Sequence, residues 1–349
     1  MSTALIIGGS GQLGRATAAR LAADGWTVTL ASRTGDTQDP RFAGLDIRSI
    51  ALDRGDTAAL HAAAHGQDLV FDTVAFTPAH AAQLTALAGQ VGSLVVVSTG
   101  AVYQGRNGTT SETAMGDEQF PEYPVPIPED WQTLPDGGSD YGSLKATMER
   151  TLLATPGLPV SILRPGTLHG PYSTSLHQWS FIKRALDGRT VVPLAYGGRS
   201  RFSTSAADNV ARLVQLCAEQ PGVRVLNAAD DDALTVEQIG RRVFALMGHD
   251  AEFVTFSGGP KEGRVGFNPW GIPRDIVLGM DAAKTELGYE QAIGYDDALQ
   301  QDIDWAISAV RAAEADGRDW TSVFPGVVAR YGADGWFPYE AEDAYLATH

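Results

Sequence analysis

The stretch ALIIGGSGQLG, which runs from Ala4 to Gly14, decides the fold. Its apolar half is typical of a short strand, it ends in glycines, and a helical pattern follows from Gln12 to Ala23. A G-x-G-x-x-G spacing between a strand and a helix lets the backbone come close to a pyrophosphate, and the amides and dipole of the helix start then face that anion. We therefore predict a dinucleotide site rather than a plain glycine-rich turn, formed by Gly8, Gly9, Ser10, Gly11, Gln12, Leu13 and Gly14.

Further short runs of apolar and β-branched residues follow, and helical stretches separate them. They are TVTLAS (27–32), SIALD (49–53), DLVFDTVA (68–75) and SLVVVST (93–99), with an alanine-rich helical stretch at 78–89. Strands that alternate with helices at this spacing indicate right-handed crossovers and an open parallel sheet. The predicted fold is doubly wound α/β and Rossmann-like. Because ligands of such sheets bind beyond the carboxyl ends of the strands, functional residues are expected there.

The composition argues against several classes of protein. The 349 residues suffice for one large domain or two of ordinary size, and 44% of them are hydrophobic. A formal net charge of −16 argues against nucleic acid or an anionic membrane as the main partner. The single cysteine, Cys217, excludes an internal disulfide and a cysteine metal cluster, and the histidines show no metal-ligand spacing. No apolar run approaches the ~20 residues of a membrane span and no basic leader precedes the first strand, so we expect a cytoplasmic protein.

The end of the second strand bears on the choice of dinucleotide. An acid at this point would hold the ribose 2′-hydroxyl of NAD, but the chain reads Ala31-Ser32-Arg33-Thr34. Arg33 can pair with a 2′-phosphate while Ser32 donates a hydrogen bond, which favours NADP(H) over NAD(H). A solvated surface arginine is the alternative. Asp53, at the end of the third strand, is either a contact for the adenine amino group or an ordinary turn aspartate.

A second group of polar residues follows the fifth strand. Ser98 and Thr99 stand at its carboxyl end, and Tyr141 and Lys145 follow further along in YGSLK. Residues four apart lie on one face of a helix, so the phenol and the ammonium can point at the same bound group. Alone, however, such a pair also fits the polar edge of an ordinary amphipathic helix.

Four segments taken together resemble one family. GGSGQLG, STGAVY, YGSLK and LRPGTLHGP (163–171) have the order and spacing of an extended short-chain dehydrogenase/reductase of the sugar epimerase/dehydratase type, and the resemblance covers roughly residues 4 to 310. It implies that Tyr141 is the general acid/base and that Lys145 favours the phenolate and holds the nicotinamide ribose. By the same resemblance Thr99 hydrogen-bonds the reacting oxygen, whereas Ser98 is structural. Further cofactor contacts are then expected at Ala75, Gly166 and Thr167.

The regular alternation fades from about residue 167, where the resemblance implies a smaller, irregular substrate domain. We predict a dinucleotide domain over 1–166, to which segments near 191–215 return, and a substrate domain over 167–330. By the resemblance, Arg201 contacts the phosphates of a nucleotide sugar. The chain is expected to form a homodimer through the helix at 78–90 and the helix that carries Tyr141.

Two segments are left open by the sequence. The long, proline-rich loop at 106–140 is either part of the substrate rim or a non-functional insertion. The acidic, aromatic tail at 331–349 either packs back on the chain or pairs with a second subunit.

The chain departs from the family at two places. Gly100 and Ala101 stand where the dehydratases carry an Asp–Glu pair, so dehydration is disfavoured. Thr167 and His169 stand where many nucleotide-sugar enzymes have an asparagine and a tyrosine, which argues against a UDP-sugar substrate. His169 is either a substrate ligand or a hydrogen-bonded structural histidine.

Three functions follow from these observations. The first is an NADP(H)-dependent oxidoreductase that interconverts a carbonyl and an alcohol on a small polar or sugar-like substrate bound by Thr99, Tyr141, His169 and Arg201. The second is a nucleotide-sugar 4-epimerase that retains its dinucleotide. The third, a non-catalytic dinucleotide-sensing or RNA-binding protein on the same fold, is disfavoured by the acidic charge and the intact Thr99, Tyr141 and Lys145.

Overall fold

Seven parallel strands form one sheet in the order β10-β6-β5-β4-β1-β2-β3 in the computed structural model, which describes residues 1–333 and 335–348. This order confirms the predicted doubly wound sheet, because the chain moves outward from β1 in one direction and then returns to the other side of it. The strands are β1 (Thr3–Ile7), β2 (Thr27–Ser32), β3 (Ile47–Ala51), β4 (Leu69–Asp72), β5 (Ser93–Val97), β6 (Val160–Pro165) and β10 (Arg224–Ala228).

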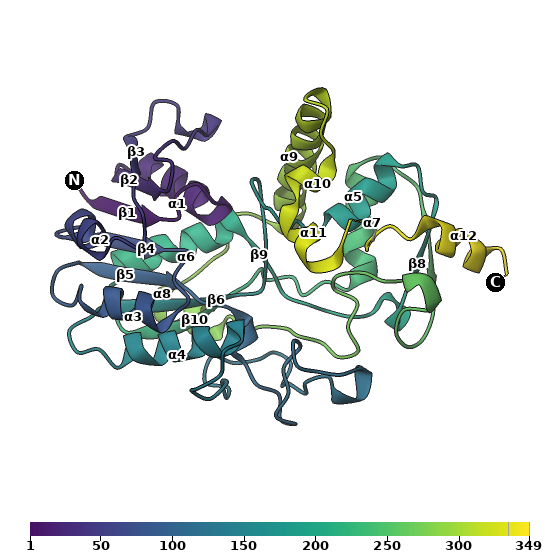
Figure 1. Cartoon of the computed structure of the whole chain (residues 1–349), viewed down its shortest axis with the longest axis horizontal. Helices are drawn as coiled ribbons and strands as arrows, with labels where there is room; N and C mark the ends of the chain where they lie inside the picture. The colour runs from purple at the N-terminus through teal and green to yellow at the C-terminus, as the bar shows by residue number, and fades with distance from the viewer. Residues whose placement is uncertain (334, 349) are drawn as a thin grey trace.

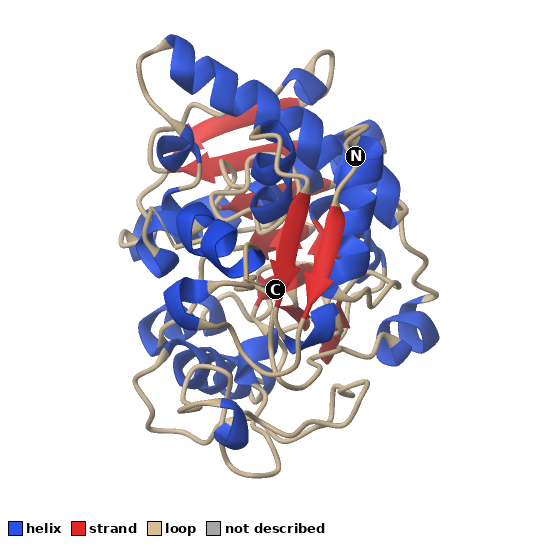
Figure 2. Cartoon of the chain, turned by 90° about the vertical axis from the view of Figure 1, so that its right-hand side faces the viewer, coloured by secondary structure: helices blue, strands red, loops and turns tan. Residues whose placement is uncertain are grey.

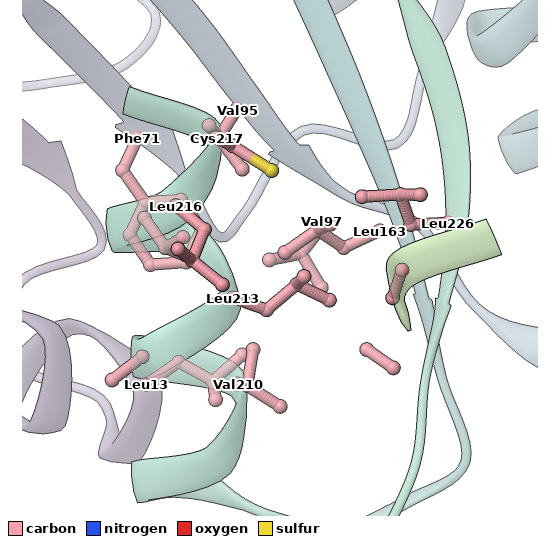
Figure 3. Close-up of a cluster of buried hydrophobic side chains, with 14 of the residues drawn as sticks. Leu13, Phe71, Val95, Val97, Leu163, Val210, Leu213, Leu216, Cys217 and Leu226 are labelled. Carbon is pink, nitrogen blue, oxygen red and sulfur yellow. The ribbon is translucent and has the colours of Figure 1, made fainter. Parts of the chain in front are cut away.

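Helices cover both faces of this sheet (Figure 1). Alternate residues of β1 point to opposite faces, as a pleated strand requires: Ala4 and Ile6 join the cluster under α1 and α6, whereas Leu5 and Ile7 join the cluster under α2, α3 and α4. Figure 3 shows the first cluster, where leucines of α6 and Cys217 pack on Phe71, Val95 and Val97 of the strands. The helices are α1 (Gln12–Ala23), α2 (Thr57–Ala64), α3 (Pro78–Thr85), α4 (Tyr141–Leu153), α6 (Ala207–Glu219) and α8 (Asp281–Leu287).

The strand predicted at 68–75 is shorter than expected. It ends at Asp72, because the carboxylate of Asp72 accepts hydrogen bonds from the amides of Val74 (3.0 Å) and Ala75 (2.9 Å) and so turns the chain. Asp72 also forms a buried ion pair with Arg54. The helix predicted at 12–23, in contrast, has these bounds in the structure.

A second lobe packs beside the carboxyl ends of the strands and has its own apolar core (Figure 1). Its helices are α5 (Trp179–Leu186), α7 (Val236–Leu246), α9 (Tyr295–Ala315), α10 (Trp320–Val323), α11 (Pro325–Tyr331) and α12 (Tyr339–Leu346). Two short parallel strand pairs accompany them, β7 (Thr167–His169) with β9 (Thr204–Ala206) and β8 (Val191–Leu194) with β11 (Glu252–Thr255). Helices surround the strands when the molecule is viewed from the side of this lobe (Figure 2).

Short 3-10 helices lie in the connecting segments. They are η1 (Pro40–Phe42), η2 (Gly100–Val102), η3 (Asp117–Gln119), η4 (Tyr196–Gly198) and η5 (Glu262–Arg264). Of these, η2 begins three residues after the end of β5, and Thr99 caps it by accepting a hydrogen bond from the amide of Ala101.

The segment predicted to return to the first domain, 191–215, divides between the two parts of the molecule. α6 packs on α1 and the sheet, and β10 extends that sheet, whereas β8 pairs with β11 outside it. Within the range 191–215, the part that packs on the sheet is α6, which begins at Ala207. The domain boundaries at 166 and 330, and the homodimer through α3 and α4, stay predictions.

The tail predicted at 331–349 packs back on the second lobe, apart from residues 334 and 349, which lie outside the described residues. Trp336 is 1% exposed in the core of the lobe. Glu342 of α12 is buried and accepts a hydrogen bond from Nη2 of Arg184 at 2.6 Å, and Asp343 pairs with Arg189. A buried ion pair that loses one partner leaves an uncompensated charge, so this contact holds α12 against α5.

Candidate active site

A cleft of about 570 Å³ lies where the carboxyl ends of β1, β4, β5 and β6 face the second lobe. Thr99, Tyr141 and Lys145 all line it, together with Gln12, Leu13, Gly166 and Thr167 from the predicted cofactor site. Residues of the 106–140 loop, Ser111, Glu112, Phe120 and Tyr123, line it as well, so this loop forms part of the rim. The structure therefore brings the three predicted catalytic residues and four further predicted cofactor residues together in one cleft.

The glycine turn leaves no room for side chains. Gly8 has a φ of +83°, and a Cβ there would lie 2.1 Å from Oγ1 of Thr73. A Cβ on Gly14 would lie 2.7 Å from the carbonyl oxygen of Gly8. Gly11 is the N-cap of α1, and no side chain of the described residues caps that helix. The first-turn amides of α1 are thus available to an anion, as a dinucleotide pyrophosphate requires.

The residues predicted to select the dinucleotide lie at the ends of β2 and β3. Arg33 is exposed and makes no ion pair or hydrogen bond with another described residue. Ser32 is buried, and its hydroxyl accepts a hydrogen bond from the amide of Gly35 at 3.1 Å, which leaves its own proton free to be donated. Asp53 is exposed and accepts from the amide of Gly55 at 2.8 Å, as a turn aspartate does.

Local contacts fix the start of α4 beside Thr99. Asp140 caps the helix by accepting from the amide of Ser143 (3.0 Å) and from its hydroxyl (2.6 Å). A Cβ on Gly142 would lie 2.6 Å from the carbonyl oxygen of Ala101, so the first turn presses directly against η2. Tyr141, the first helical residue, is thereby placed in the cleft that Thr99 also lines.

Lys145 is buried beneath the tyrosine. Its Nζ donates to the carbonyl oxygens of Ala75 (2.7 Å) and Val97 (2.6 Å) and lies 5.7 Å from the centroid of the Tyr141 ring. Burial lowers the pKa of Lys145 to about 8, although the nearby carboxylates of Asp72 and Glu149 favour the charged form. Ala75, predicted as a cofactor contact, is therefore a partner of Lys145 in this structure.

Tyr141 keeps its proton in this arrangement. Burial raises the pKa of its phenol, and the carboxylate of Glu112 raises it further, while the hydrogen bond with Thr99 acts in the opposite direction. The side chain is nonetheless 45% exposed, because it forms a wall of the cleft. The hydroxyl is thus protonated at neutral pH and open to a ligand in the cleft.

Ser98 belongs to the interior. It is 2% exposed and its hydroxyl donates to Glu149, which in turn pairs with Arg164 at 2.6 Å. This buried set joins α4 to β6. It fits the structural role predicted for Ser98 beside the cleft-facing Thr99.

The placement of His169 favours the second of its two predicted roles, that of a hydrogen-bonded structural histidine, over that of a substrate ligand. Its ring is 0% exposed, and both nitrogens are engaged: Nδ1 lies 2.7 Å from Asp302 and Nε2 lies 2.9 Å from Asp230. The two carboxylates raise the pKa of His169 to about 10 against the opposing effect of burial. His169 is therefore a buried cation that joins β7, α9 and the segment after β10, not a residue of the cleft.

Arg201 is not brought to the cleft either. Its Nη2 pairs with Oδ2 of Asp275 at 2.6 Å, its Nε donates to the same oxygen at 2.8 Å, and its amide donates to Oδ1 at 3.0 Å. It does not belong to the residues that line the cavity. The neighbouring Asp275 thus occupies the guanidinium that was expected to meet a substrate phosphate.

The second lobe supplies a part of the cleft whose residues were not predicted from the sequence. His177, Arg330 and Tyr331 line it, as do the hydroxyl-bearing residues Ser173–Ser175. Burial and the charge of Arg330 lower the pKa of His177 to about 3, so the imidazole stays neutral. No local motif marks these residues; the aromatic tail that begins at Tyr331 was the one available signal.

Metal and membrane sites were searched for in the described part of the chain. Its histidine, cysteine and acidic side chains do not gather in groups of three or more that could hold a metal ion. Among residues 1–333 and 335–348, no helix combines the length and the apolar character of a membrane span.

Comparison with known proteins supplies the family. A search of curated protein sequences found no match. Among solved structures, a UDP-N-acetylglucosamine 4-epimerase from Methanobrevibacter ruminantium M1 is similar with a TM-score of 0.67 at 18% identity, covering 88% of this chain and 99% of its own. A dTDP-glucose 4,6-dehydratase from Bacillus anthracis, in complex with NAD, gives 0.65 at 17% identity over 89% and 98% of the two chains. UDP-glucose 4-epimerase from Thermotoga maritima gives 0.64 at 20% identity over 88% and 99%.

These structural likenesses, all below 25% identity, concern the fold. The family rests on the sequence itself: residues 4–229, well over half of the chain, match the NAD dependent epimerase/dehydratase family. The matched range contains the glycine turn, Thr99, Tyr141 and Lys145. The chain therefore belongs to the NAD dependent epimerase/dehydratase family and is an NAD(P)-dependent enzyme of the extended short-chain dehydrogenase type.

Proposed function

We propose that the protein is an NADP(H)-dependent oxidoreductase that interconverts a carbonyl and an alcohol on a small polar or sugar-like substrate. The observation that carries the proposal is the meeting of Thr99, Tyr141 and Lys145 on one wall of the cleft, next to the glycine turn. A bound nicotinamide supplies or accepts the hydride. The test is turnover with oxidised or reduced cofactor in the wild type and in the Tyr141→Phe variant.

Each of the three residues has a distinct task in this proposal. Tyr141 holds the proton that passes to a carbonyl oxygen on reduction and takes it back on oxidation. Thr99 hydrogen-bonds both the phenol and the reacting oxygen, which fixes their approach. Lys145 is a buried donor of hydrogen bonds beneath the tyrosine, and a cofactor ribose can replace one of its carbonyl partners.

The preference for NADP(H) rests on the exposed, unpaired Arg33. We expect Arg33→Ala to weaken NADP binding roughly tenfold to a hundredfold, because hydrogen bonds to charged groups contribute about 1.5–3 kcal/mol. NAD binding should change little. The measurement is a titration of both dinucleotides by the change in intrinsic fluorescence. Equal affinities for NAD and NADP in the wild type would contradict the assignment, and Arg48→Ala, on the neighbouring strand, is the control.

Dehydration remains disfavoured in this proposal. Gly100 and Ala101 line the cleft at the positions where the family's dehydratases carry two acids. Glu112 is the one carboxylate among the described residues that line the cavity, and it approaches the tyrosine from the 106–140 loop. A single acid beside the phenol does not replace the missing pair.

A nucleotide-sugar 4-epimerase is the second candidate, favoured by the family match and by the UDP-sugar epimerases among similar structures. The same tyrosine and threonine would remove and return the proton while the dinucleotide stays bound. This function predicts that purified protein contains stoichiometric dinucleotide and converts UDP-glucose without added cofactor. An oxidoreductase instead stops after one turnover unless cofactor is supplied.

A further inference from the structure

We propose that Arg330, which lines the cleft, binds an anionic group of the substrate, either a carboxylate or a phosphate. The inference rests on the proposed function, because it takes the cleft of Thr99 and Tyr141 to be the substrate site. It goes further by assigning a charge to the substrate and naming the residue that recognises it. Arg330 lies outside the range that the family match covers.

The position of Arg330 is set by the docking of α11. The amide of Gly326 donates to the carbonyl oxygen of Thr174 at 2.9 Å, and a Cβ on Gly326 would lie 2.9 Å from that same oxygen. The start of α11 therefore touches the 173–175 segment, which itself lines the cleft. One helical turn later, Arg330 and Tyr331 line the cavity that Tyr141 also lines.

Aromatic packing anchors the chain directly after Arg330. The ring of Tyr331 lies 5.3 Å from that of Trp336 and 6.3 Å from that of His177, measured between centroids. Trp336 is 1% exposed, and α12 beyond it is held by the buried pair of Arg184 and Glu342. The segment that carries Arg330 is thus a fixed part of the second lobe and not a loose end.

Among the described charged side chains that line the cleft, that of Arg330 is the one available to bind an anion. It forms no ion pair with another described residue, whereas Lys145, the other cation that lines the described cavity, donates to two backbone carbonyls. His177, next to Arg330, stays neutral. Glu112 acts on Tyr141, so a negative group is repelled from the reacting end and attracted to Arg330. The two charges therefore orient an anionic substrate with its neutral carbon at the tyrosine.

The anion is assigned to the substrate and not to the cofactor. The pyrophosphate of a dinucleotide already has donors in the uncapped first turn of α1. Arg330, in contrast, directly precedes Tyr331, whose ring lies near His177 and packs against the aromatic core of the second lobe. Because Arg201 is paired with Asp275, Arg330 of α11 is the arginine that this cleft offers to an anion.

The test compares four ligands that share one sugar ring: glucose, glucuronate, glucose 1-phosphate and UDP-glucose. Each is titrated calorimetrically into full-length protein saturated with dinucleotide. We expect at least one anionic ligand to bind more tightly than glucose, and Arg330→Gln to weaken it about tenfold or more. Binding of glucose and of the dinucleotide should stay unchanged. The anionic ligand whose affinity exceeds that of glucose by the largest factor shows whether the recognised group is a carboxylate or a phosphate.

Two further variants make the test specific. Arg318→Gln removes an exposed arginine that pairs with Asp316 outside the cleft, and it should bind all ligands as the wild type does. Arg330→Lys keeps the charge and should retain part of the preference. The proposal is overturned if no anionic ligand binds the wild type better than glucose, if Arg330→Gln binds like the wild type, or if the loss falls on the dinucleotide. A failure of the proposed function is seen separately, as absent hydride transfer in the wild type.

Discussion

Replacing Tyr141 with phenylalanine should lower turnover by about 10²–10⁴-fold, which is the usual contribution of a general acid/base. The variant loses one hydroxyl at the rim of the cleft and keeps its ring, while Lys145 keeps its two carbonyl partners beneath it. Dinucleotide affinity should therefore change by less than about threefold. The measurement is steady-state turnover together with a separate titration of cofactor.

Tyr289→Phe is the matched control for that experiment. Tyr289 is a tyrosine of the first lobe as well, but it is buried and lies outside the cleft. Its variant should retain turnover, since no reacting group depends on that hydroxyl. If Tyr141→Phe kept more than a tenth of the wild-type rate, the phenol would not be the proton donor, and Glu112 would become the next group to test.

The local signals of the first lobe were sufficient to predict it. The inner strands of the sheet are covered on both faces, so a run such as ALII is apolar throughout and stands out from its neighbours. The glycine turn was predictable for a related reason: a Cβ on Gly8 or Gly14 would overlap a neighbouring atom, so the geometry requires these glycines. The end of β4 was not predictable from the sequence, because it depends on the orientation of one carboxylate, that of Asp72.

The candidate site was predictable where its residues belong to continuous motifs. Tyr141 and Lys145 are one helical turn apart, and Thr99 lies two residues after a strand that the sequence marks clearly. Arg330 carries no such mark, because its position depends on the docking of α11 and the burial of Trp336, which are contacts between distant segments. Arg201 shows the converse case. Its motif was present in the sequence, but the ion pair with Asp275 occupies its guanidinium.

His169 is the clearest case of a residue whose role depends on distant partners. Its two carboxylates lie 61 and 133 positions away in the sequence, and neither is part of a motif. Asp230 also accepts from the hydroxyl of Thr204 (2.8 Å) and the side-chain amide of Asn209 (2.8 Å). Through Asp302 on α9 the cluster ties the second lobe to the carboxyl edge of the sheet.

We expect His169→Gln to lower the free energy of unfolding by about 3–5 kcal/mol, because removal of the cation leaves two buried carboxylates facing one another. The measurement is the urea midpoint at pH 6. The double variant His169→Gln/Asp302→Asn carries one charge fewer and should be more stable than the single variant. A single variant within 1 kcal/mol of the wild type would show that the cluster does not hold the lobes together.

The pH dependence gives an independent check with a defined sign. His169 binds its proton more tightly in the folded state, where its pKa is about 10, than in the unfolded chain, where it is about 6.5. Its contribution is therefore complete below pH 6.5 and is lost as the pH rises toward 10.

Hydrogen bonds and the histidine charge lower the pKa of Asp230 to about 2, so its contribution is lost as the pH falls from about 4 toward 2. Burial raises the pKa of Asp302, which works against stability once that carboxyl ionises. The wild type should thus lose stability relative to His169→Gln as the pH rises from 6.5 to 10, because the variant lacks the group that releases the proton.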